Sequence, residues 1–328
     1  IIPLTPTPSL RERGLWKISN NKFIWNLCTL PNYLRHNPVD IYHTQYILPF
    51  FVNKKIKLIT LIHDVSFRVY PELIKWSDRF FLKILIPWSL KRADQILTVS
   101  EFTKREIEKY YKISLEKIAV VPNSGGEDLK VEISQEELNN IKEKYSLPEK
   151  FILYLGTMQP RKNLPILLTV LARLKTAGWK LVLAGPKNAY HQDPQIEKII
   201  QKLSLEKDVI FTGYVAESEK AALFKLAGVF CSPAFYEGFN IPLLEALRMG
   251  TPAIVSDISP HREVAGDAAL YFTPENTEDL KEKIIAIDED IDLRDRLIQD
   301  SKARVQIFSW KKTAEKTLEI YRKLSNKI

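Results

Sequence analysis

Two adjacent cations stand in a short loop between an apolar run and a helical pattern. Arg161 and Lys162 follow the run 151–155 and precede Asn163, whose side chain we expect to cap the helix. Gly156 lets the loop pass close to a ligand. A guanidinium and an ammonium beside the free N–H groups of a helix N-terminus form an anion site, and together they could neutralise a diphosphate. Taken alone, such a pair is more often a solvated part of a surface loop.

A second loop carries two carboxylates. Glu237 precedes Gly238, and Glu245 falls in the first turns of the helix that Pro242 begins. Carboxylates accept hydrogen bonds from vicinal hydroxyls, so the pair would suit a sugar and a ribose, with a pyrophosphate between them on the helix N-terminus. For Glu245, a surface acid favoured by the helix dipole is the alternative.

A third candidate is a histidine at the end of an apolar run. His63 and Asp64 directly follow 58–62, and a strand there would turn the histidine toward the ligand side of a sheet. A structural histidine is the alternative. The segment 288–290 reads Asp-Glu-Asp, which spells an Asp-x-Asp metal motif, but it lies between two amphipathic patterns rather than after a strand. We expect a solvated acidic turn there and predict no metal site.

Hydrophobic periodicity indicates the elements that position these residues. From residue 151 onward, short apolar runs alternate with amphipathic stretches, which predicts a parallel sheet covered by helices on both faces. The expected strands are 151–155, 181–184, 209–211, 229–232, 253–256 and 269–272, and the expected helices are 164–175, 195–203, 217–226, 242–249 and 277–287. The front half shows the same alternation of strands and helices. The expected strands lie near Ile41 and at 58–62, 95–99 and 118–121, and the expected helices at 73–91 and 102–111.

These patterns predict an α/β chain with two Rossmann-like, doubly wound domains that face each other across a cleft. The expected first domain is 1–124, the linker and helix are 125–150, and the second domain is 151–309. The helical pattern 310–328 is expected to join the first domain. Ligands of such folds bind beyond the carboxyl ends of the strands, which is where all three candidate loops fall.

Composition and charge limit the class of protein and the kinds of partner that the chain could bind. The chain has 328 residues, 45% of them hydrophobic and 27% charged, as is typical of a globular protein. Of the net charge of +8, residues 1–124 hold 19 Lys and Arg against 10 Asp and Glu, and the rest holds 29 against 30. A basic front half suggests a phosphorylated lipid acceptor or an anionic membrane surface, with a plain basic domain as the alternative. No nucleic-acid module is recognisable, and nucleic acid is not expected as a partner.

Two further features bear on location. Cys28 and Cys231 are the only cysteines, and two distant cysteines form no disulfide framework, so the reducing cytoplasm is the expected compartment. The segment 75–92 interleaves aromatic and basic residues, which is typical of an interfacial membrane helix and equally of a core helix with a basic outer face. Those residues are Trp76, Phe80, Phe81, Ile84, Leu85 and Trp88 with Lys75, Arg79, Lys83, Lys91 and Arg92.

Together the motifs resemble the retaining glycosyltransferases of family 4, which have the GT-B fold, from about Asp40 to Leu324. The strongest shared motif is Glu-x7-Glu, formed by Glu237 and Glu245. The supporting motifs are 63–64, 99–102, 121–123, 156–163, 211–215, 256–258 and 262–266. Segments 42–45 and 63–67 are most similar to the bacterial mannosyltransferase-like branch that builds O-antigen and other surface polysaccharides.

The resemblance implies roles for individual residues. Arg161 and Lys162 would hold the donor diphosphate, Glu237 the hydroxyls of the transferred sugar, and Glu245 the ribose, while His63 would touch the donor sugar from the opposite domain. The catalytic set is then His63, Glu237, Arg161 and Lys162. The remaining donor-binding residues are Gly156, Gly238, Phe239 and Asn240 around the phosphates and Tyr214 and Val215 beside the base.

The implied activity is a retaining, metal-independent transfer of a hexose, with mannose as the candidate, in polysaccharide biosynthesis. The donor is a nucleotide diphosphate sugar, no further cofactor is implied, and the acceptor is a glycan or lipid-linked glycan. The acceptor would attack on the leaving-group face, and the donor phosphate would take its proton. A non-catalytic nucleotide-sugar-binding subunit and a GT-B nucleotide-sugar epimerase are the alternatives. The expected location is the cytoplasm, with membrane association on the cytoplasmic face as an option.

The sequence departs from the family pattern at three places. Asn240 stands where the family usually has Gly, and Ser124 follows Asn123 where Gly is usual. Residues 1–40 contain only Gly14 and no strand-Gly-helix signal. We therefore expect the first domain to lack its opening strand and Gly-rich turn.

Overall fold

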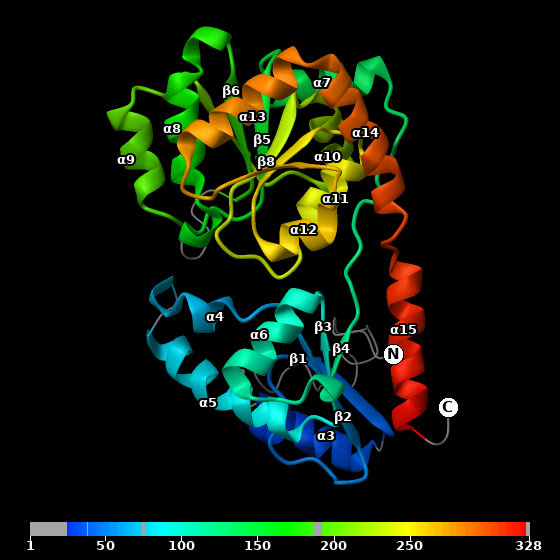
Figure 1. Ribbon diagram of the computed structural model, residues 1–328. Helices are drawn as coiled ribbons and strands as arrows, with labels where there is room; N and C mark the ends of the chain where they lie inside the picture. Colours follow the sequence, from blue (N-terminus) through cyan, green and yellow to red (C-terminus); the bar gives the residue numbers. More distant parts are fainter. Residues whose placement is uncertain (1–24, 38, 74–75, 187–191, 326–328) are drawn as a thin grey trace.

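Two separate parallel sheets organise the chain, and the computed structural model describes it over residues 25–37, 39–73, 76–186 and 192–325. One sheet and its helices form the lower half of Figure 1 and the other the upper half. A loop joins the strands 41–45 and 57–62, and helical elements follow the other strands, so neighbouring strands can run in the same direction. The predicted fold class, two parallel α/β domains, is confirmed.

The first sheet has four strands that pair in chain order. They are β1 (Ile41–Gln45), β2 (Lys57–Ile62), β3 (Gln95–Thr98) and β4 (Ile118–Val120). The helical elements of this half are η2 (Trp25–Thr29), α3 (Leu30–His36), α4 (Ser66–Val69), η3 (Pro71–Leu73), α5 (Trp76–Arg92), α6 (Glu101–Tyr111) and η4 (Leu115–Lys117). The predicted absence of an opening strand concerns residues 1–40, of which 1–24 lie outside the described residues, and 25–36 form η2 and α3.

The second sheet has six strands in the order β10-β9-β8-β5-β6-β7. They are β5 (Phe151–Leu155), β6 (Lys180–Ala184), β7 (Val209–Gly213), β8 (Val229–Ser232), β9 (Ala253–Ser256) and β10 (Leu270–Phe272). The first strand of this half, β5, pairs with the fourth, β8, and the chain builds outward from them in both directions. This is the doubly wound arrangement, in which the crevice for a ligand opens where the order reverses.

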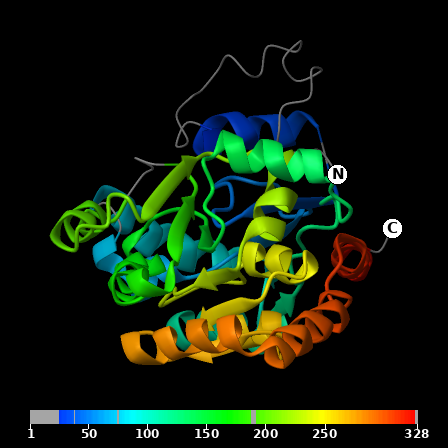
Figure 2. The same ribbon diagram turned by 90° about the horizontal axis from the view of Figure 1, so that it is seen from above.

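Helices cover both faces of the second sheet. They are α7 (Gln135–Lys144), η5 (Pro160–Lys162), α8 (Leu164–Arg173), η6 (Lys175–Ala177), α9 (Gln195–Lys202), α10 (Glu217–Leu226), α11 (Ile241–Arg248), α12 (Ser259–Ala265), α13 (Thr277–Glu289) and α14 (Ile291–Val305). Figure 2 shows α13, in orange, and α7, in green, on opposite sides of the strands. Within the described ranges, none of the helices has both the length and the apolar character that crossing a bilayer requires.

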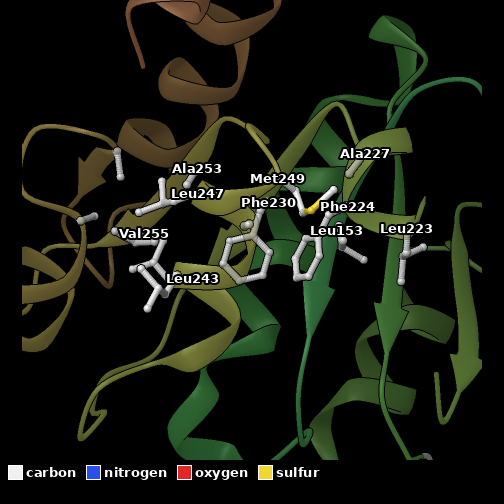
Figure 3. Close-up of a cluster of buried hydrophobic side chains, with 14 of the residues drawn as sticks. Leu153, Leu223, Phe224, Ala227, Phe230, Leu243, Leu247, Met249, Ala253 and Val255 are labelled. Atoms are coloured by element: carbon white, nitrogen blue, oxygen red, sulfur yellow. The ribbon is translucent and has the colours of Figure 1, made fainter. Parts of the chain in front are cut away.

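The core of the second half follows from the alternation of side chains along β5. Phe151 and Leu153 join one hydrophobic cluster, and Ile152 and Tyr154 join the cluster on the opposite face. In the first cluster Phe224 of α10 meets Phe230 of β8 edge to face, with ring centroids 5.9 Å apart. Figure 3 shows these rings beside Leu153 at the centre of the sheet. A sheet buried on both faces holds its strand ends rigidly, which matters for the loops that leave them.

The chain passes between the two halves twice. It crosses upward after β4, and it returns to α15 (Trp310–Leu324), which runs down beside the first half in Figure 1 and packs Ile320 against the first sheet. Arg248 of α11 joins the two crossings, because its guanidinium donates to Gly125 O at 2.8 Å and to Phe308 O at 3.3 Å. The domain boundaries drawn from the sequence at 124, 150 and 309 stay predictions.

Close contact between two strand-end loops gives a test of the fold. Gly185 follows β6 with φ +150°, and a Cβ there would lie 2.1 Å from the carbonyl oxygen of Gly156. We expect Gly185→Ala to lower the free energy of unfolding by about 2–4 kcal/mol, since both the backbone angle and the clash oppose it. Gly178→Ala is the control: its φ is +75° and nothing lies within 4 Å, so about 1 kcal/mol is expected. Equal losses in urea unfolding would contradict the proposed contact.

Candidate functional site

A cavity of about 240 Å³ lies between the two halves of the chain. The first half contributes residues from the ends of its strands: His63, Asp64, Val99 and Asn123. The second half contributes the ends of β5 and β8 and the start of α11, through Tyr154, Leu155, Gly156, Lys162, Ser232, Glu237, Gly238, Phe239, Asn240, Ile241 and Pro242. The three loops singled out in the sequence therefore meet at one place.

A buried cluster of charges forms the wall of the cavity beside β5 and β8. Glu237 is 7% exposed, and its two carboxylate oxygens pair with Lys162 Nζ and, at 3.3 Å, with Arg161. Arg161 also donates to the carbonyl oxygen of Tyr236 at 2.9 Å. Two cations thus share one carboxylate, and the three side chains together keep one positive charge. Asp64, which also lines the cavity, interacts electrostatically with both cations, so an anion that enters the cavity meets two cations and two carboxylates in surroundings that shield charges poorly.

The state of Glu237 follows from this arrangement. Burial by itself would raise the pKa of the carboxyl, but Lys162 and Arg161 lower that pKa to about 2. The carboxylate is therefore ionised at neutral pH and acts only as a hydrogen-bond acceptor. Such a group suits a ligand that offers hydroxyls.

A network of buried polar side chains fixes the loop that follows β8. Asn240 adopts the left-handed region, with φ +79°, and its amide nitrogen contacts Ser232 Oγ and His261 Nε2, each at 2.8 Å. Its amide oxygen accepts from Leu243 N at 3.2 Å and so caps α11. Asn is one of the few residues that tolerates this backbone where Gly is usual, which explains the departure at position 240. The loop geometry is kept by hydrogen bonds in place of a glycine.

His261 sits at the other end of this network and is fully buried. Its Nδ1 lies 2.8 Å from Ser256 O, a contact that requires the N–H on Nδ1 and leaves Nε2 to accept from Asn240. Burial, opposed by Glu237, lowers the pKa of His261 to about 4, so the ring is neutral. The sequence offered no signal for this role, because its partners come from three separate segments.

Tyr236 carries the same loop into the first half. Its ring packs in the first domain's core cluster, 5.3 Å from Phe102 and 6.0 Å from Tyr70, and its hydroxyl lies 3.4 Å from Val65 N. The next glycine, Gly238, has no room for a side chain, because a Cβ would lie 2.1 Å from the carbonyl oxygen of His63. The charged cluster and the contact between the halves therefore share one loop.

A second contact joins the halves through a helix terminus. Glu263 of α12 accepts hydrogen bonds from Glu101 N at 2.8 Å and Phe102 N at 2.6 Å, the first amides of α6. These amides have no partner within the helix, and a carboxylate there is also favoured by the helix dipole. Ser100 caps the same helix through Thr103 N, as its sequence predicted.

The predicted site residues fall into two groups. His63, Gly156, Lys162, Glu237, Gly238, Phe239 and Asn240 line the cavity, and Arg161 joins them through Glu237. The other three lie outside its lining: Tyr214 is 74% exposed, Val215 is buried in the core, and Glu245 is buried along α11. Asp64, Asn123 and Ser232 also line the cavity; Asp64 and Asn123 belong to motifs noted in the sequence, but none of the three was assigned a role there.

The structure tests two sequence-based predictions about polar residues, the Asn163 cap and the acidic turn at 288–290. Asn163 stands at the start of α8, but its side chain makes no capping bond and donates instead to Pro274 O at 2.8 Å, so the predicted cap was wrong. Its φ of +55° turns the amide toward that carbonyl. The acidic turn predicted at 288–290 is wrong for its first two residues, because α13 continues through Asp288 and Glu289; Asp288 pairs with Lys150, and Asp290 alone separates the helices and caps α14 through Leu293 N. Over the described ranges, no three His, Cys, Asp or Glu side chains lie together as metal ligands would.

Two parallel α/β halves that meet at a cavity lined by their facing strand-end loops define a GT-B fold. Residues 6–124 match the family described as Glycosyltransferase Family 4, and residues 135–304 match Glycosyl transferases group 1. The chain belongs to the glycosyl transferases group 1 family, and the resemblance to family 4 glycosyltransferases is confirmed.

Individual relatives carry related names. The chain is 28% identical over 304 residues to O-antigen chain mannosyltransferase B of Escherichia coli, covering 92% of this chain and 77% of that one. It is 30% identical over 243 residues to serotype-specific mannosyltransferase WbdA of Escherichia coli, covering 71% of this chain but only 29% of WbdA. Among solved structures, Anabaena HepE in complex with UDP and glucose superposes with a TM-score of 0.74, at 16% identity over 89% of this chain and 80% of HepE. At that identity the superposition shows the fold.

The ionised Glu237 predicts a particular pH dependence of stability. Its pKa in the folded chain, about 2, lies below its ordinary value of 4.5, so its contribution is complete above pH 4.5 and is lost as the pH falls toward 2. From about pH 6 to about pH 3 we expect the unfolding free energy of the wild type to fall by about 2 kcal/mol more than that of Glu237→Gln. Urea unfolding at several pH values measures this. The exposed Glu132→Gln should follow the wild type, and parallel curves for all three would refute the charge cluster.

Proposed function

We propose that the chain transfers a hexose, with mannose as the candidate, from a nucleotide diphosphate sugar to a glycan or lipid-linked acceptor in polysaccharide biosynthesis. The observation that carries this proposal is the placement of Arg161 and Lys162 against Glu237 at the ends of two neighbouring strands. The two cations suit the diphosphate of the donor, and the ionised carboxylate of Glu237 suits the hydroxyls of its sugar. The names of the mannosyltransferase relatives and the UDP and glucose bound to HepE support the same assignment.

In this proposal the cations take the charge of the leaving group. The oxygen of the acceptor attacks C1 of the donor sugar from the leaving-group face, the bond from C1 to the diphosphate breaks, and the acceptor proton passes to a phosphate oxygen. The configuration at C1 is then retained. Arg161 and Lys162 stabilise the developing diphosphate, which is electrostatic stabilisation of the transition state and takes the place of a metal ion.

The first half of the chain supplies the remaining contact with the sugar. His63 lines the cavity opposite the charged cluster, and burial, opposed by Asp64, lowers the pKa of its ring. A neutral imidazole can donate or accept one hydrogen bond with a hydroxyl of the transferred hexose. The segment that bears His63 touches Gly238, so contact between the halves completes the donor site.

The donor site is tested by thermal melting with GDP, UDP, GDP-mannose and UDP-sugars. We expect one nucleotide family to raise the midpoint of the wild type, and the shift to disappear in Arg161→Ala with Lys162→Ala, because ligands that bind the folded state stabilise it. The matched control removes two exposed cations of α15, Lys316→Ala with Lys323→Ala, and should keep the shift.

The reaction products distinguish the proposed transferase from the two alternative functions, an epimerase and a non-catalytic binding subunit. Nuclear magnetic resonance of the mixture follows the donor, with and without glycan acceptors. Transfer with retention supports the proposal. Conversion of the donor sugar without any acceptor would show an epimerase, and binding without turnover would show a non-catalytic nucleotide-sugar-binding subunit. No shift with any nucleotide would contradict the donor site itself.

We also propose that the first half contacts anionic membrane on the cytoplasmic face, where a lipid-linked acceptor would be held. The surface proposed for this contact lies where η2, the loop 49–55 and α5 meet. Phe50 N donates to Asn26 O at 3.4 Å, and the Phe50 ring stacks on Trp88 with ring centroids 4.7 Å apart. Large apolar side chains are exposed around this junction beside basic ones, as an interfacial surface requires. We call Trp25, Leu27, Phe51, Lys54, Lys55 and Ile84 the aromatic-basic surface. The side chains of Trp76, Phe80 and Phe81, named from the sequence, lie outside the described residues.

Co-sedimentation with phospholipid vesicles tests this surface. We expect binding to vesicles that contain phosphatidylglycerol and little binding to pure phosphatidylcholine. Lys54→Glu with Lys55→Glu should weaken binding by about 1 kcal/mol for each position, and Phe51→Ser should weaken it further. The α15 variant Lys316→Ala with Lys323→Ala should bind like the wild type. Unchanged sedimentation of the Lys54 and Lys55 variant would refute this surface.

A further inference from the structure

One carboxylate oxygen of Glu245 is buried without a partner. Glu245 is 5% exposed, and its Oε2 makes no hydrogen bond, whereas Oε1 receives Lys220 Nζ at 3.4 Å. In the described part of the chain only two other buried side-chain atoms lack a partner, Ser124 Oγ and Trp179 Nε1. A buried polar atom left unpaired costs on the order of 1–3 kcal/mol, so its retention points to a ligand group that pairs with it.

The charges that face Glu245 come from two elements. Lys220 and Glu217 lie on α10, and Asp128 lies in the crossing after β4. Arg248, one turn along α11, is engaged with carbonyl oxygens of the two crossings. Burial raises the pKa of Glu245, Lys220 lowers it, and Glu217 and Asp128 raise it. Lys220 is thus the group in this environment that favours the ionised carboxylate.

The Lys220 contact is not an ordinary surface ion pair. The side chains of Lys220 and Glu245 are 15% and 7% exposed, whereas Glu217, which also pairs with Lys220 at 2.8 Å, is 64% exposed. A pair on the surface contributes little because water screens it, but a half-buried pair is screened far less. The ammonium lies between an exposed and a buried carboxylate and compensates the buried one.

We propose that Lys220 is a positioning residue for the donor site: from α10 it keeps the Glu245 carboxylate charged and holds it by one oxygen, which leaves Oε2 to accept from a ribose hydroxyl. This inference rests on the proposed function, since it assumes that a nucleotide binds beside α11. It adds a residue from an element that none of the sequence motifs for the donor site included. Lys220 itself does not touch the reacting atoms.

The dissociation constant of the nucleotide that shifts the melting midpoint is measured by calorimetry between about pH 5 and pH 8. In the wild type the affinity should fall as the pH drops and Glu245 takes up a proton. Lys220→Gln removes the charge at similar length, and we expect this fall to begin about one pH unit higher, with roughly tenfold weaker binding below it. Lys220→Arg should restore the wild-type profile. Lys225→Gln, on the exposed side of the same helix, should leave it unchanged.

Two results would overturn the proposal. One is an equal loss of affinity in Lys220→Gln at every pH, which would mean that the lysine acts through packing or by contacting the nucleotide. The other is an undiminished effect of Lys220→Gln in a Glu245→Gln background, since the two effects must couple if the lysine acts through that carboxylate.

A measurement without ligand separates this proposal from the proposed function. Carbon-13 resonance of glutamate carboxyls, assigned by comparison with Glu245→Gln, follows the protonation of Glu245 directly. We expect the midpoint to rise in Lys220→Gln and to return in Lys220→Arg. An unchanged midpoint refutes the role of Lys220 even if a nucleotide binds. A raised midpoint with no nucleotide binding supports the Lys220–Glu245 coupling and places the failure in the donor assignment.

Discussion

The parallel pairing of β5 with β8 is the interaction on which the candidate site depends. The register sets Ile152 against Val229 and Leu153 against Phe230, so both strands end at the same edge of the sheet. The loop after one strand carries Arg161 and Lys162, and the loop after the other carries Glu237. Neither loop could hold its charges in a buried place alone, because an unpaired buried charge is costly. Backbone pairing therefore brings together side chains that compensate each other.

The same loop also governs how the two halves meet. Tyr236 packs in the first half, Glu237 binds the cations, Gly238 touches the backbone of His63, and Asn240 fixes the start of α11. These four functions fall on five consecutive positions of a segment that is rigid at both ends. A shift in the contact between the halves would therefore move the residues of the charged cluster, and a ligand that moves the cluster would shift the contact.

Strand and helix periodicity made most of the fold predictable from the sequence. The strands of the second sheet are nearly continuous apolar runs, a pattern that follows from burial on both faces. Helices α4 and α12 were not predicted, because both are short and α12 contains Pro260. Their helical state depends on neighbours that a local pattern does not contain.

The candidate site was predictable to the extent that it lies at strand ends. His63 directly follows an apolar run, Lys162 and Glu237 lie in the loops that follow two others, and topology alone brings such positions together. The partners of these residues were not predictable in the same way. His261 and Glu263 act through hydrogen bonds to segments far away in sequence, and the spacing of residues along the chain carries no information about them.

The double crossing between the halves determines which relative motions are open to the chain. Thr313 Oγ1 donates to Pro122 O at 2.5 Å and Trp310 N to Glu127 Oε1 at 2.7 Å, so the two crossing segments run side by side and are bonded to each other. A single linker would allow the halves to swivel about their long axis. Two linkers that are bonded to each other favour rotation about one axis that passes through both, and the arrangement seen here, with Tyr236 in the core of the first half and Glu263 on the first amides of α6, is one end of that rotation.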